Sequence, residues 1–299
     1  MSPGRTVRSG TIALFGRPNA GKSTLLNCLV GERVSIVTHK PQTTRHRITG
    51  IVNRPGGQLV LVDTPGLHNR RDDALNRHLN RLAAESLRGV DLALLLIDAA
   101  NPTGEDEAAA RAVRQAGIRA VLVFNKIDRV KRRQDLLPLT RTWSEKLDSV
   151  EVFFISALDG DGVEELADGL VKYLPEAPPQ YPADEFTTES ARFLAAEIVR
   201  EQLLENLHQE VPYGTTVVIE SFVEEKGRVD IDALILVAEK RHKGMVIGKG
   251  AQTLKRIGTR ARMAMQQLFD APVHLELNVR VEQGWTDRED VFARLGYRR

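Results

Sequence analysis

Hydrophobic and polar residues alternate in blocks along the first half of the chain. Five short apolar runs rich in Val, Ile and Leu each end in a polar or glycine-rich loop, at residues 11–15, 59–62, 92–97, 120–124 and 152–155. Continuous apolar runs of this length are typical of strands buried on both faces of a parallel sheet. The segments between them have helical spacing, as at 75–88, 105–115 and 163–173. The pattern therefore predicts a doubly wound α/β domain.

A proline-rich stretch ends this alternation. Four prolines fall within residues 175–182, and because proline fixes φ and lacks an N–H donor, neither a helix nor a central strand continues there. The pattern beyond predicts a helix over 189–206, strands over 215–223 and 228–239, a helix over 251–269, a strand over 273–281 and a helical tail over 287–295. The predicted parts are an α/β domain (1–174), a linker (175–188) and a smaller α+β domain (189–299).

Composition excludes several classes of protein. With 42% hydrophobic and 27% charged residues, the 299-residue chain is neither disordered nor fibrous. Its single cysteine excludes a disulfide framework and any zinc site built from several thiolates, and it fits a cytoplasmic location. We expect no transmembrane helix, because no apolar run approaches about 20 residues. We expect no signal peptide, because no apolar core follows the two arginines of residues 1–10. The net charge of +2 is informative only when it is resolved by position.

A phosphate-binding motif follows the first predicted strand. Residues 16–23 match G-x-x-x-x-G-K-[ST], and an amphipathic helix follows over 24–30. The glycines let backbone N–H groups converge on phosphate oxygens, Lys22 can reach the β- and γ-phosphates, and the Ser23 hydroxyl suits Mg²⁺. The predicted phosphate-binding residues are Gly16, Arg17, Pro18, Asn19, Ala20, Gly21, Lys22, Ser23 and Thr24.

A second motif, Asp63-Thr64-Pro65-Gly66, follows the next buried strand. A carboxylate at a strand end suits an Mg²⁺ contact, and the backbone N–H of Gly66 can approach a γ-phosphate. In the loop before it, one threonine can complete the Mg²⁺ sphere when GTP is bound. Thr44 is favoured over its neighbour Thr43, and both remain open. The predicted metal ligands are thus Ser23, Thr44 and Asp63.

Residues 125–128, Asn-Lys-Ile-Asp, are predicted to select guanine over adenine as the base of the bound nucleotide. The Asp128 carboxylate can accept both N1–H and the exocyclic N2–H of guanine, whereas adenine offers neither donor on that edge. Asn125 would brace the loops around the base and Lys126 would lie over its face. After the last strand of the domain come Ser156, Ala157 and Leu158, where the Ala157 N–H can donate to guanine O6.

Together these motifs resemble a translational-type GTPase domain over residues 11–174. The segments GRPNAGKS, PQTTRHR and DTPGLH are closer to the Era family of bacterial GTPases, and residues 245–258, 271–277 and 284–285 resemble its C-terminal KH domain. The resemblance implies a P-loop GTPase domain followed by a type II KH domain. It also implies a GTP-hydrolysing factor with GTP or GDP and Mg²⁺ as ligands. Such a factor would bind the 3′ end of 16S ribosomal RNA, assist maturation of the 30S subunit and associate peripherally with the inner membrane; a monomer is expected.

The KH resemblance places RNA on a basic stretch. Residues 240–269 include eight Lys or Arg and no acidic residue, which is the pattern of a phosphate-binding surface. A KH domain carries G-x-x-G, but the fourth position here is alanine, which starts a helix better than glycine and could crowd a phosphate. Val246, Ile247, Leu254, Ile257 and Met265 are expected to form a core face. The predicted RNA-binding residues are Lys243, Gly248, Lys249, Gly250, Ala251, Lys255 and Arg256.

Hydrolysis would depend on Lys22, Thr44 and Gly66 through charge neutralisation and positioning. Ras-like GTPases orient water with a glutamine at the place of Leu67, so slow intrinsic turnover is expected here, with water held by backbone or by a partner. Asn19 resembles the residue with which related GTPases hold K⁺. Two alternatives stay open: an RNA-binding module tuned by nucleotide with negligible turnover, and a membrane-associated signalling GTPase.

Overall fold

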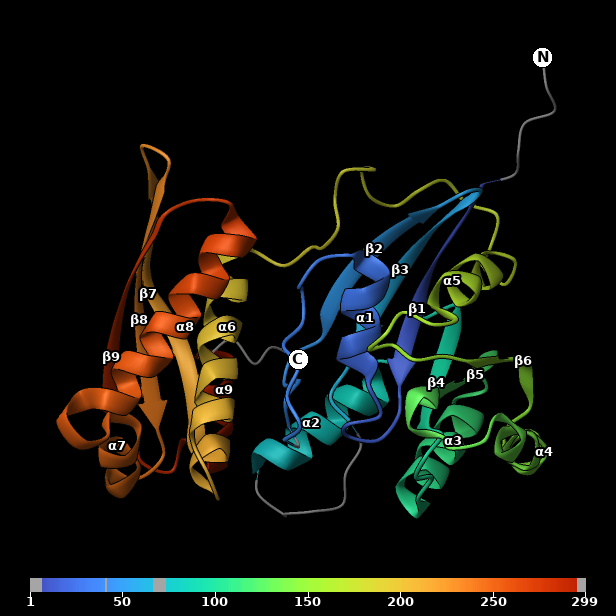
Figure 1. The fold of residues 1–299 in the computed structure, drawn as a ribbon, viewed down its shortest axis with the longest axis horizontal. Coiled ribbons are helices and arrows are strands. Elements are labelled where there is room, and N and C mark those ends of the chain that lie inside the picture. The colour runs from blue at the N-terminus through green and yellow to red at the C-terminus, as the bar shows by residue number, and fades with distance from the viewer. Residues whose placement is uncertain (1–6, 41, 67–73, 295–299) are drawn as a thin grey trace. The chain divides into compact units, whose positions relative to one another are not determined.

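The computed structural model describes residues 7–40, 42–66 and 74–294. These residues form two compact units (Figure 1). The first takes its described residues from Met1–Ser35, Thr44–Arg70 and Leu79–Thr188, and the second from Ile36–Thr43, Arg71–His78 and Glu189–Arg299. Two short segments of the first half of the chain therefore pack with the second unit.

A six-stranded sheet forms the centre of the first unit. Its strands are β1 (Arg8–Phe15), β2 (Ile48–Arg54), β3 (Gly57–Asp63), β4 (Leu92–Asp98), β5 (Ala120–Asn125) and β6 (Ser149–Phe154). They lie in the order β2-β3-β1-β4-β5-β6, and only β2 is antiparallel to its neighbour. This confirms the predicted α/β class with a mostly parallel sheet.

Helices cover both faces of this sheet. They are α1 (Lys22–Val30), α2 (Ala74–Glu85), α3 (Gly104–Ala116), α4 (Leu136–Lys146) and α5 (Val163–Val171). Alternate strand residues such as Phe15, Leu95 and Phe124 pack against Ala110 of α3 and Trp143 of α4 in one buried cluster. Helices α1 and α5 contact each other and β3 on the other face. The inner strands β1, β3, β4 and β5 are buried on both faces along most of their length, which explains their continuous apolar runs.

The sequence pattern gave no sign of β2 and α4. Strand β2 lies at the sheet edge, where polar residues such as Thr49 and Asn53 interrupt the apolar run. Only Leu136 and Trp143 of α4 are buried, so its apolar stripe is too narrow to stand out.

The proline-rich stretch runs along the first unit. Gln58 of β3, which is buried, accepts hydrogen bonds from the N–H groups of Gln180 (2.8 Å) and Tyr181 (3.0 Å). The Ile51 N–H of β2 donates to the Phe186 carbonyl at 2.9 Å. Because these bonds fix its backbone, residues 175–188 pack as an extension of the first unit.

The second unit joins helices to a three-stranded sheet. Its elements are α6 (Ala191–Asn206), β7 (Thr215–Glu225), β8 (Arg228–Val237), α7 (Lys240–Ile247), α8 (Gln252–Phe269), β9 (Val273–Val281) and α9 (Glu289–Arg294). Strand β8 pairs antiparallel with β7 and parallel with β9. Short 3₁₀ helices cover Ile127–Arg129, Arg133–Asp135, Val211–Gly214, Lys249–Ala251 and Trp285–Asp287.

The core of this unit includes part of the predicted face. Val246, Ile257 and Met265 are fully buried, while Ile247 and Leu254 are half-buried. Helix α7 was not predicted, because its basic, glycine-containing sequence leaves only His242 and Val246 inside.

No helix within residues 7–40, 42–66 and 74–294 has the length and apolar character that crossing a membrane requires.

Candidate nucleotide site and nucleic-acid interface

Two glycines determine the path of the loop between β1 and α1. Gly16 has φ +151°, and a Cβ there would lie 2.6 Å from the Leu96 carbonyl oxygen. Gly21 has φ +100°, and a Cβ there would overlap the side-chain amide of Asn125. Since other residues rarely adopt such angles and have no room for a Cβ, glycine is required at both positions.

The Lys22 side chain folds back across this loop. Its buried ammonium donates to the carbonyls of Gly16 (3.1 Å) and Arg17 (2.9 Å). Burial lowers the pKa of Lys22 from 10.5 to about 8, although the neighbouring Asp63 carboxylate opposes this shift. The negative charge of a phosphate group at this loop would stabilise the ammonium, which burial has removed from water.

Three oxygen ligands converge beside Lys22. The Ser23 hydroxyl lies 2.5 Å from Asp63 Oδ2 and 2.9 Å from the Thr44 hydroxyl, and the Thr44 hydroxyl lies 3.4 Å from the same carboxylate oxygen. Ser35 also donates to Asp63 Oδ2, at 3.0 Å. Asp63 Oδ1 is buried and accepts no hydrogen bond from any described residue. Hard oxygen donors with one unsatisfied carboxylate oxygen fit Mg²⁺.

The geometry separates the two candidate threonines. Thr43 hydrogen-bonds to the Thr38 hydroxyl (2.7 Å) and donates to the Lys40 carbonyl (2.6 Å), whereas Thr44 belongs to the oxygen cluster.

Burial raises the pKa of the Asp63 carboxyl, a shift that the Lys22 charge opposes. A divalent ion would oppose it further.

The segment after β3 approaches the phosphate loop. A Cβ at Gly66 would lie 2.5 Å from the Pro18 nitrogen, so the two backbones are in close contact. The buried Thr64 hydroxyl donates to the Leu14 carbonyl at 3.0 Å and so fixes this segment to β1. Leu67, to which the slow turnover was attributed, lies outside the described residues.

Asn125 braces the loops where a guanine base was predicted. Its Nδ2 donates to the Ala20 carbonyl (2.9 Å), and its Oδ1 accepts from the N–H groups of Lys126 (2.8 Å) and Ala157 (3.0 Å). The Ala157 N–H is therefore already engaged, so donation to guanine O6 requires this amide to be shared or released. The phosphate loop and the loops after β5 and β6 are tied to one side chain.

Asp128 and Ser156 face each other. The Ser156 hydroxyl donates to Asp128 Oδ1 at 2.8 Å, which orients the carboxylate predicted to read the base. Leu158 is 74% exposed, while Ala157 is buried. Among the remaining predicted loop residues, Ala20 and Pro65 are buried, and Pro18 and Thr24 are half-buried.

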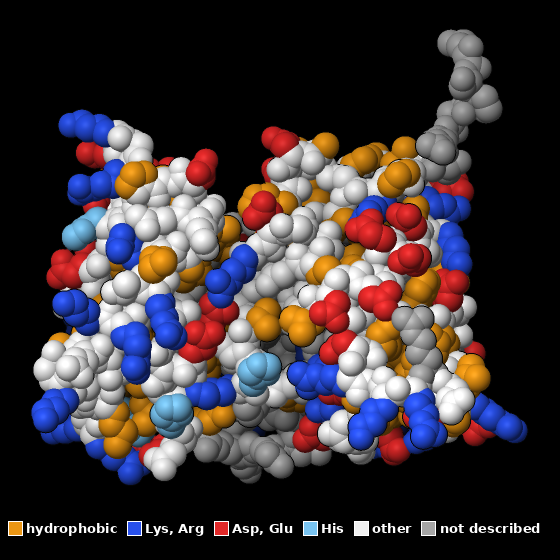
Figure 2. Space-filling view, in the orientation of Figure 1, with side chains coloured by type: hydrophobic (Ala, Val, Ile, Leu, Met, Phe, Trp, Pro, Cys, Tyr) orange, Lys and Arg blue, Asp and Glu red, His pale blue; other side chains and the backbone are white. Residues whose placement is uncertain are grey.

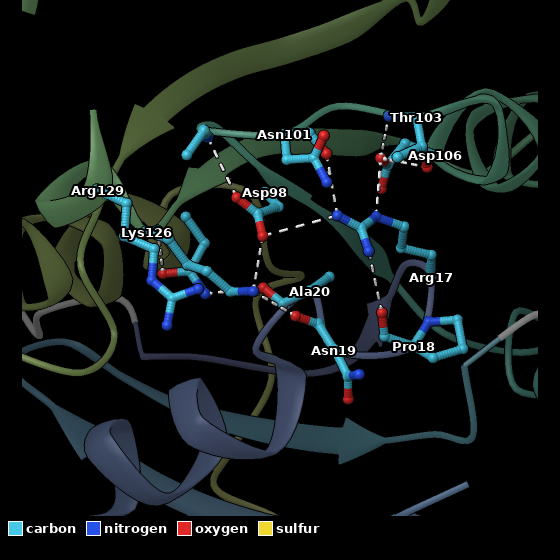
Figure 3. Close-up of polar contacts among 12 residues, drawn as sticks. Arg17, Pro18, Asn19, Ala20, Asp98, Asn101, Thr103, Asp106, Lys126 and Arg129 are labelled. Carbon is cyan, nitrogen blue, oxygen red and sulfur yellow. Dashed lines mark hydrogen bonds and ion pairs between the residues drawn. The ribbon is translucent and has the colours of Figure 1, made fainter. Parts of the chain in front are cut away.

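Arg17 joins a charged network at one end of the phosphate loop (Figure 3). Its Nε donates to Asp106 Oδ2 at 3.0 Å, and its Nη2 donates to the Asn101 carbonyl at 3.0 Å and lies 3.6 Å from Asp98 Oδ2. The structure thus places the Arg17 guanidinium against carboxylates. Sequence reasoning missed Asp98 and Asp106, although an acid directly after the apolar run 92–97 was a usable signal.

The basic loop of the second unit has a tight turn. A Cβ at Gly248 (φ +74°) would overlap the Thr253 side chain, and both Gly250 (φ +57°) and Ala251 (φ +60°) have left-handed backbone angles. Ala251 precedes α8 outside the helix, so the argument that alanine suits a helix start is wrong here. The position favours glycine, and alanine costs about 1–2 kcal/mol there.

Basic side chains of α7 and α8 point outward. Lys243, Lys249, Lys255 and Arg256 are exposed, and Figure 2 shows Lys and Arg side chains over these helices. Arg241 instead pairs with Glu239 at 2.7 Å. The predicted positions therefore form a solvent-facing cationic surface around the Gly248–Ala251 turn.

Helix α6 carries buried charges that the sequence analysis missed. Arg200, 2% exposed, pairs with Glu197 at 2.6 Å and donates to the backbone carbonyl of Thr43. Buried Glu201 accepts the Val37 N–H at 3.1 Å. These contacts hold the segment Ile36–Thr43 within the second unit. The available signal was an i, i+3 pair of opposite charge, Glu197 and Arg200, in the middle of this helix.

Comparison with known proteins gives the family. Residues 11–126 match a family described as 50S ribosome-binding GTPase, and residues 210–286 match the KH domain. "GTPase Era" of Stenotrophomonas maltophilia strain K279a is 51% identical over 297 residues, covering 99% of this chain and all of the relative. The chain belongs to the Era family of GTPases.

Other members of the Era family agree with this assignment. "GTPase Era" of Xanthomonas axonopodis is 50% identical over 290 residues, covering 97% of each chain. An Era variant from Aquifex aeolicus bound to GDP·AlF₄⁻ has a TM-score of 0.92 at 36% identity. An Era structure with MgGDPNP and nucleotides 1506–1542 of 16S ribosomal RNA has a TM-score of 0.93 at 36% identity. Each structure covers 97% of this chain and 99% of its own.

Proposed function

We propose that this Era-family chain hydrolyses GTP and binds 16S ribosomal RNA near its 3′ end during maturation of the 30S subunit. The observation that carries the proposal is the convergence of the Ser23, Thr44 and Asp63 oxygens beside the buried Lys22 ammonium. This arrangement suits a nucleoside triphosphate with a divalent ion. The GDP·AlF₄⁻ and MgGDPNP complexes of the Era relatives support the same ligand class.

The residues of the first unit would divide the work of hydrolysis. Lys22 and the loop amides neutralise phosphate charge, and the Gly66 N–H contacts the γ-phosphate. Ser23, Thr44 and Asp63 would hold Mg²⁺, which supplies further charge neutralisation when bound. Asp128, oriented by Ser156, accepts the two donors of guanine and leaves adenine without partners.

The second unit would hold the RNA. Lys249 lies at the tip of the Gly248–Ala251 turn, and Lys255 and Arg256 follow on the first turns of α8. Exposed cations around a tight turn suit the sugar–phosphate backbone of single-stranded RNA. The Era relative bound to 16S ribosomal RNA nucleotides supports this assignment.

RNA binding is tested by the substitution Lys249→Glu. We expect weaker binding to an RNA with the 3′-terminal sequence of 16S ribosomal RNA, and a salt dependence reduced by about one counterion. Lys226→Glu, at the exposed β7–β8 turn of the same unit, makes an equal charge change away from the G-x-x-G region. Unchanged affinity and salt slope for Lys249→Glu, or equal loss for the control, would overturn the RNA assignment.

A second function is favoured by Leu67, whose side chain has no polar group to hold water: an RNA-binding module that nucleotide tunes with negligible turnover. Single-turnover hydrolysis of GTP, with and without the RNA, separates it from the GTPase. If RNA accelerates hydrolysis, the chain acts as a GTPase. If bound GTP stays intact both with and without RNA, the chain is an RNA-binding module that nucleotide tunes.

The proposal extends to location and monovalent ions. We place a monomeric chain in the cytoplasm with peripheral contact to the inner membrane. A K⁺ ion would lie near Asn19, whose amide in Figure 3 points away from Lys126 and Arg17. Equal turnover in K⁺ and Na⁺ buffers would refute the K⁺ site. Absence from sedimented anionic liposomes would refute membrane contact, and with it a membrane-associated signalling GTPase.

A further inference from the structure

Asp98, the last residue of β4, lies close to basic side chains from two loops, Lys126 and Arg17 (Figure 3). Its Oδ2 lies 2.7 Å from the Lys126 ammonium and 3.6 Å from Arg17 Nη2, while Oδ1 accepts the Ala100 N–H at 3.1 Å. The residue is only 6% exposed. A buried carboxylate with these three partners fixes the positions of the groups that donate to it.

The contact with Lys126 is the closer of the two. A lysine side chain has four rotatable bonds, and holding it in place costs entropy. Here the ammonium donates to Asp98 Oδ2 at 2.7 Å and to the Asn19 carbonyl at 2.6 Å. The Lys126 backbone also has a left-handed φ of +64°. Without Asp98, one carbonyl would hold this ammonium in place of two acceptors.

Arg17 depends far less on Asp98. Arg17 also donates hydrogen bonds to the Asp106 carboxylate at 3.0 Å and to the Asn101 carbonyl at 3.0 Å. Both hydrogen bonds would remain if Asp98 were replaced. Asp106 is itself fixed, because its Oδ2 accepts the Thr103 N–H at 2.8 Å in a capping box at the start of α3. The loss of Asp98 should therefore act mainly on Lys126.

We propose that Asp98 is a positioning residue for guanine-nucleotide binding, which acts by holding the Lys126 side chain over the face of the base. This inference rests on the proposed function of Lys126 in the base site. Asp98 touches neither the base nor the phosphates in this role. It preorganises a flexible cation, and preorganisation lowers the ordering cost of binding.

A double-mutant cycle on the full chain tests the inference. GDP affinity is measured by displacement of a fluorescent GDP analogue for wild type, Asp98→Asn, Lys126→Ala and the double variant. We expect Asp98→Asn to weaken GDP binding about tenfold in the wild-type background. In the Lys126→Ala background its effect falls below twofold, because the residue on which it acts is gone.

Asp106→Asn is the matched control, since it removes a buried carboxylate that contacts Arg17 but not Lys126. Its effect on GDP affinity should be the same with or without Lys126. Melting temperatures of all variants show how much each substitution changes the stability of the fold, separately from its effect on GDP affinity. Asp98→Glu, which keeps the charge, should recover most of the affinity.

The outcomes separate the inference from the proposed site. A Lys126→Ala variant with wild-type affinity would overturn the base site and the inference with it. If Lys126→Ala weakens binding while Asp98→Asn does not, the inference alone fails. It also fails if Asp98→Asn costs the same tenfold in both backgrounds, because Asp98 would then act on the fold and not through Lys126.

Discussion

Replacement of Gly21 by alanine gives a sharp test of the nucleotide site. A Cβ at this position overlaps the Asn125 amide, which must then move. Asn125 makes three hydrogen bonds, to Ala20 at 2.9 Å and from the N–H groups of Lys126 at 2.8 Å and Ala157 at 3.0 Å. Its displacement therefore loosens the phosphate loop and the loops after β5 and β6, all of which are predicted to contact the nucleotide.

The size of the effect follows from these bonds. Each of the three hydrogen bonds contributes about 1 kcal/mol. Re-ordering the loops on binding therefore reduces the free energy of GDP binding by about 3 kcal/mol. Since 1.4 kcal/mol is a factor of ten, the Kd for GDP should rise roughly 100-fold. The backbone strain of alanine at φ +100° affects free and bound protein alike, so it lowers stability without changing affinity.

Gly31→Ala is the matched control. Gly31 ends α1 with φ +81°, and no atom of a described residue comes within 4 Å of an added Cβ. This variant should lose about 1–2 kcal/mol of stability to strain, while its GDP affinity stays at the wild-type value. Fluorescence titration with a labelled GDP and calorimetric melting measure the two effects. A Gly21→Ala variant within threefold of wild-type affinity, or a Gly31→Ala variant equally weakened, would refute the reasoning.

Three further predictions concern other features. Thr44→Ala should weaken Mg²⁺-dependent binding of a non-hydrolysable GTP analogue about tenfold, while Thr43→Ala should leave it unchanged; titration with each variant would contradict the metal assignment if both behaved alike. Ala251→Gly should relieve left-handed strain and raise stability by about 1–2 kcal/mol, and a lower melting temperature would count against it. Trp285→Phe removes the buried hydrogen bond from Nε1 to the Gly214 carbonyl (3.0 Å) and should cost about 1–3 kcal/mol; urea unfolding with no change in midpoint would disprove this.

The sequence allowed the architecture of the first unit to be predicted because strands buried on both faces and a glycine-constrained loop leave strong signals. Gly16 and Gly21 have little freedom to be anything else, and the apolar run 92–97 has to lie inside a sheet. Features set by tertiary contacts were harder to predict. β2 (Ile48–Arg54) is an edge strand with mixed polarity, and α7 (Lys240–Ile247) buries only two side chains.

Part of the site escaped sequence reasoning for the same reason. Asn125 and Asp128 were proposed as base-site residues from their motif, but their hydrogen-bond partners come from elsewhere in the chain. Nothing local indicates that Asp98 reaches the Lys126 ammonium or that Ala157 already donates to Asn125. The conformation of Ala251 could not be read from helix propensity either, because propensity describes helical backbone and this residue lies just outside the helix.

The segment Ile36–Thr43, held by buried charges of α6, has a practical consequence for dissecting the protein. The chain changes unit at five places along its length, so cutting it at the proline-rich stretch does not yield two intact halves. A fragment that begins at Glu189 would lose the backbone groups that Arg200 and Glu201 bind, and it would expose charges that the whole chain keeps from water. Truncated versions would thus report on an altered α6, and comparisons between fragment and intact chain need that helix to be monitored directly.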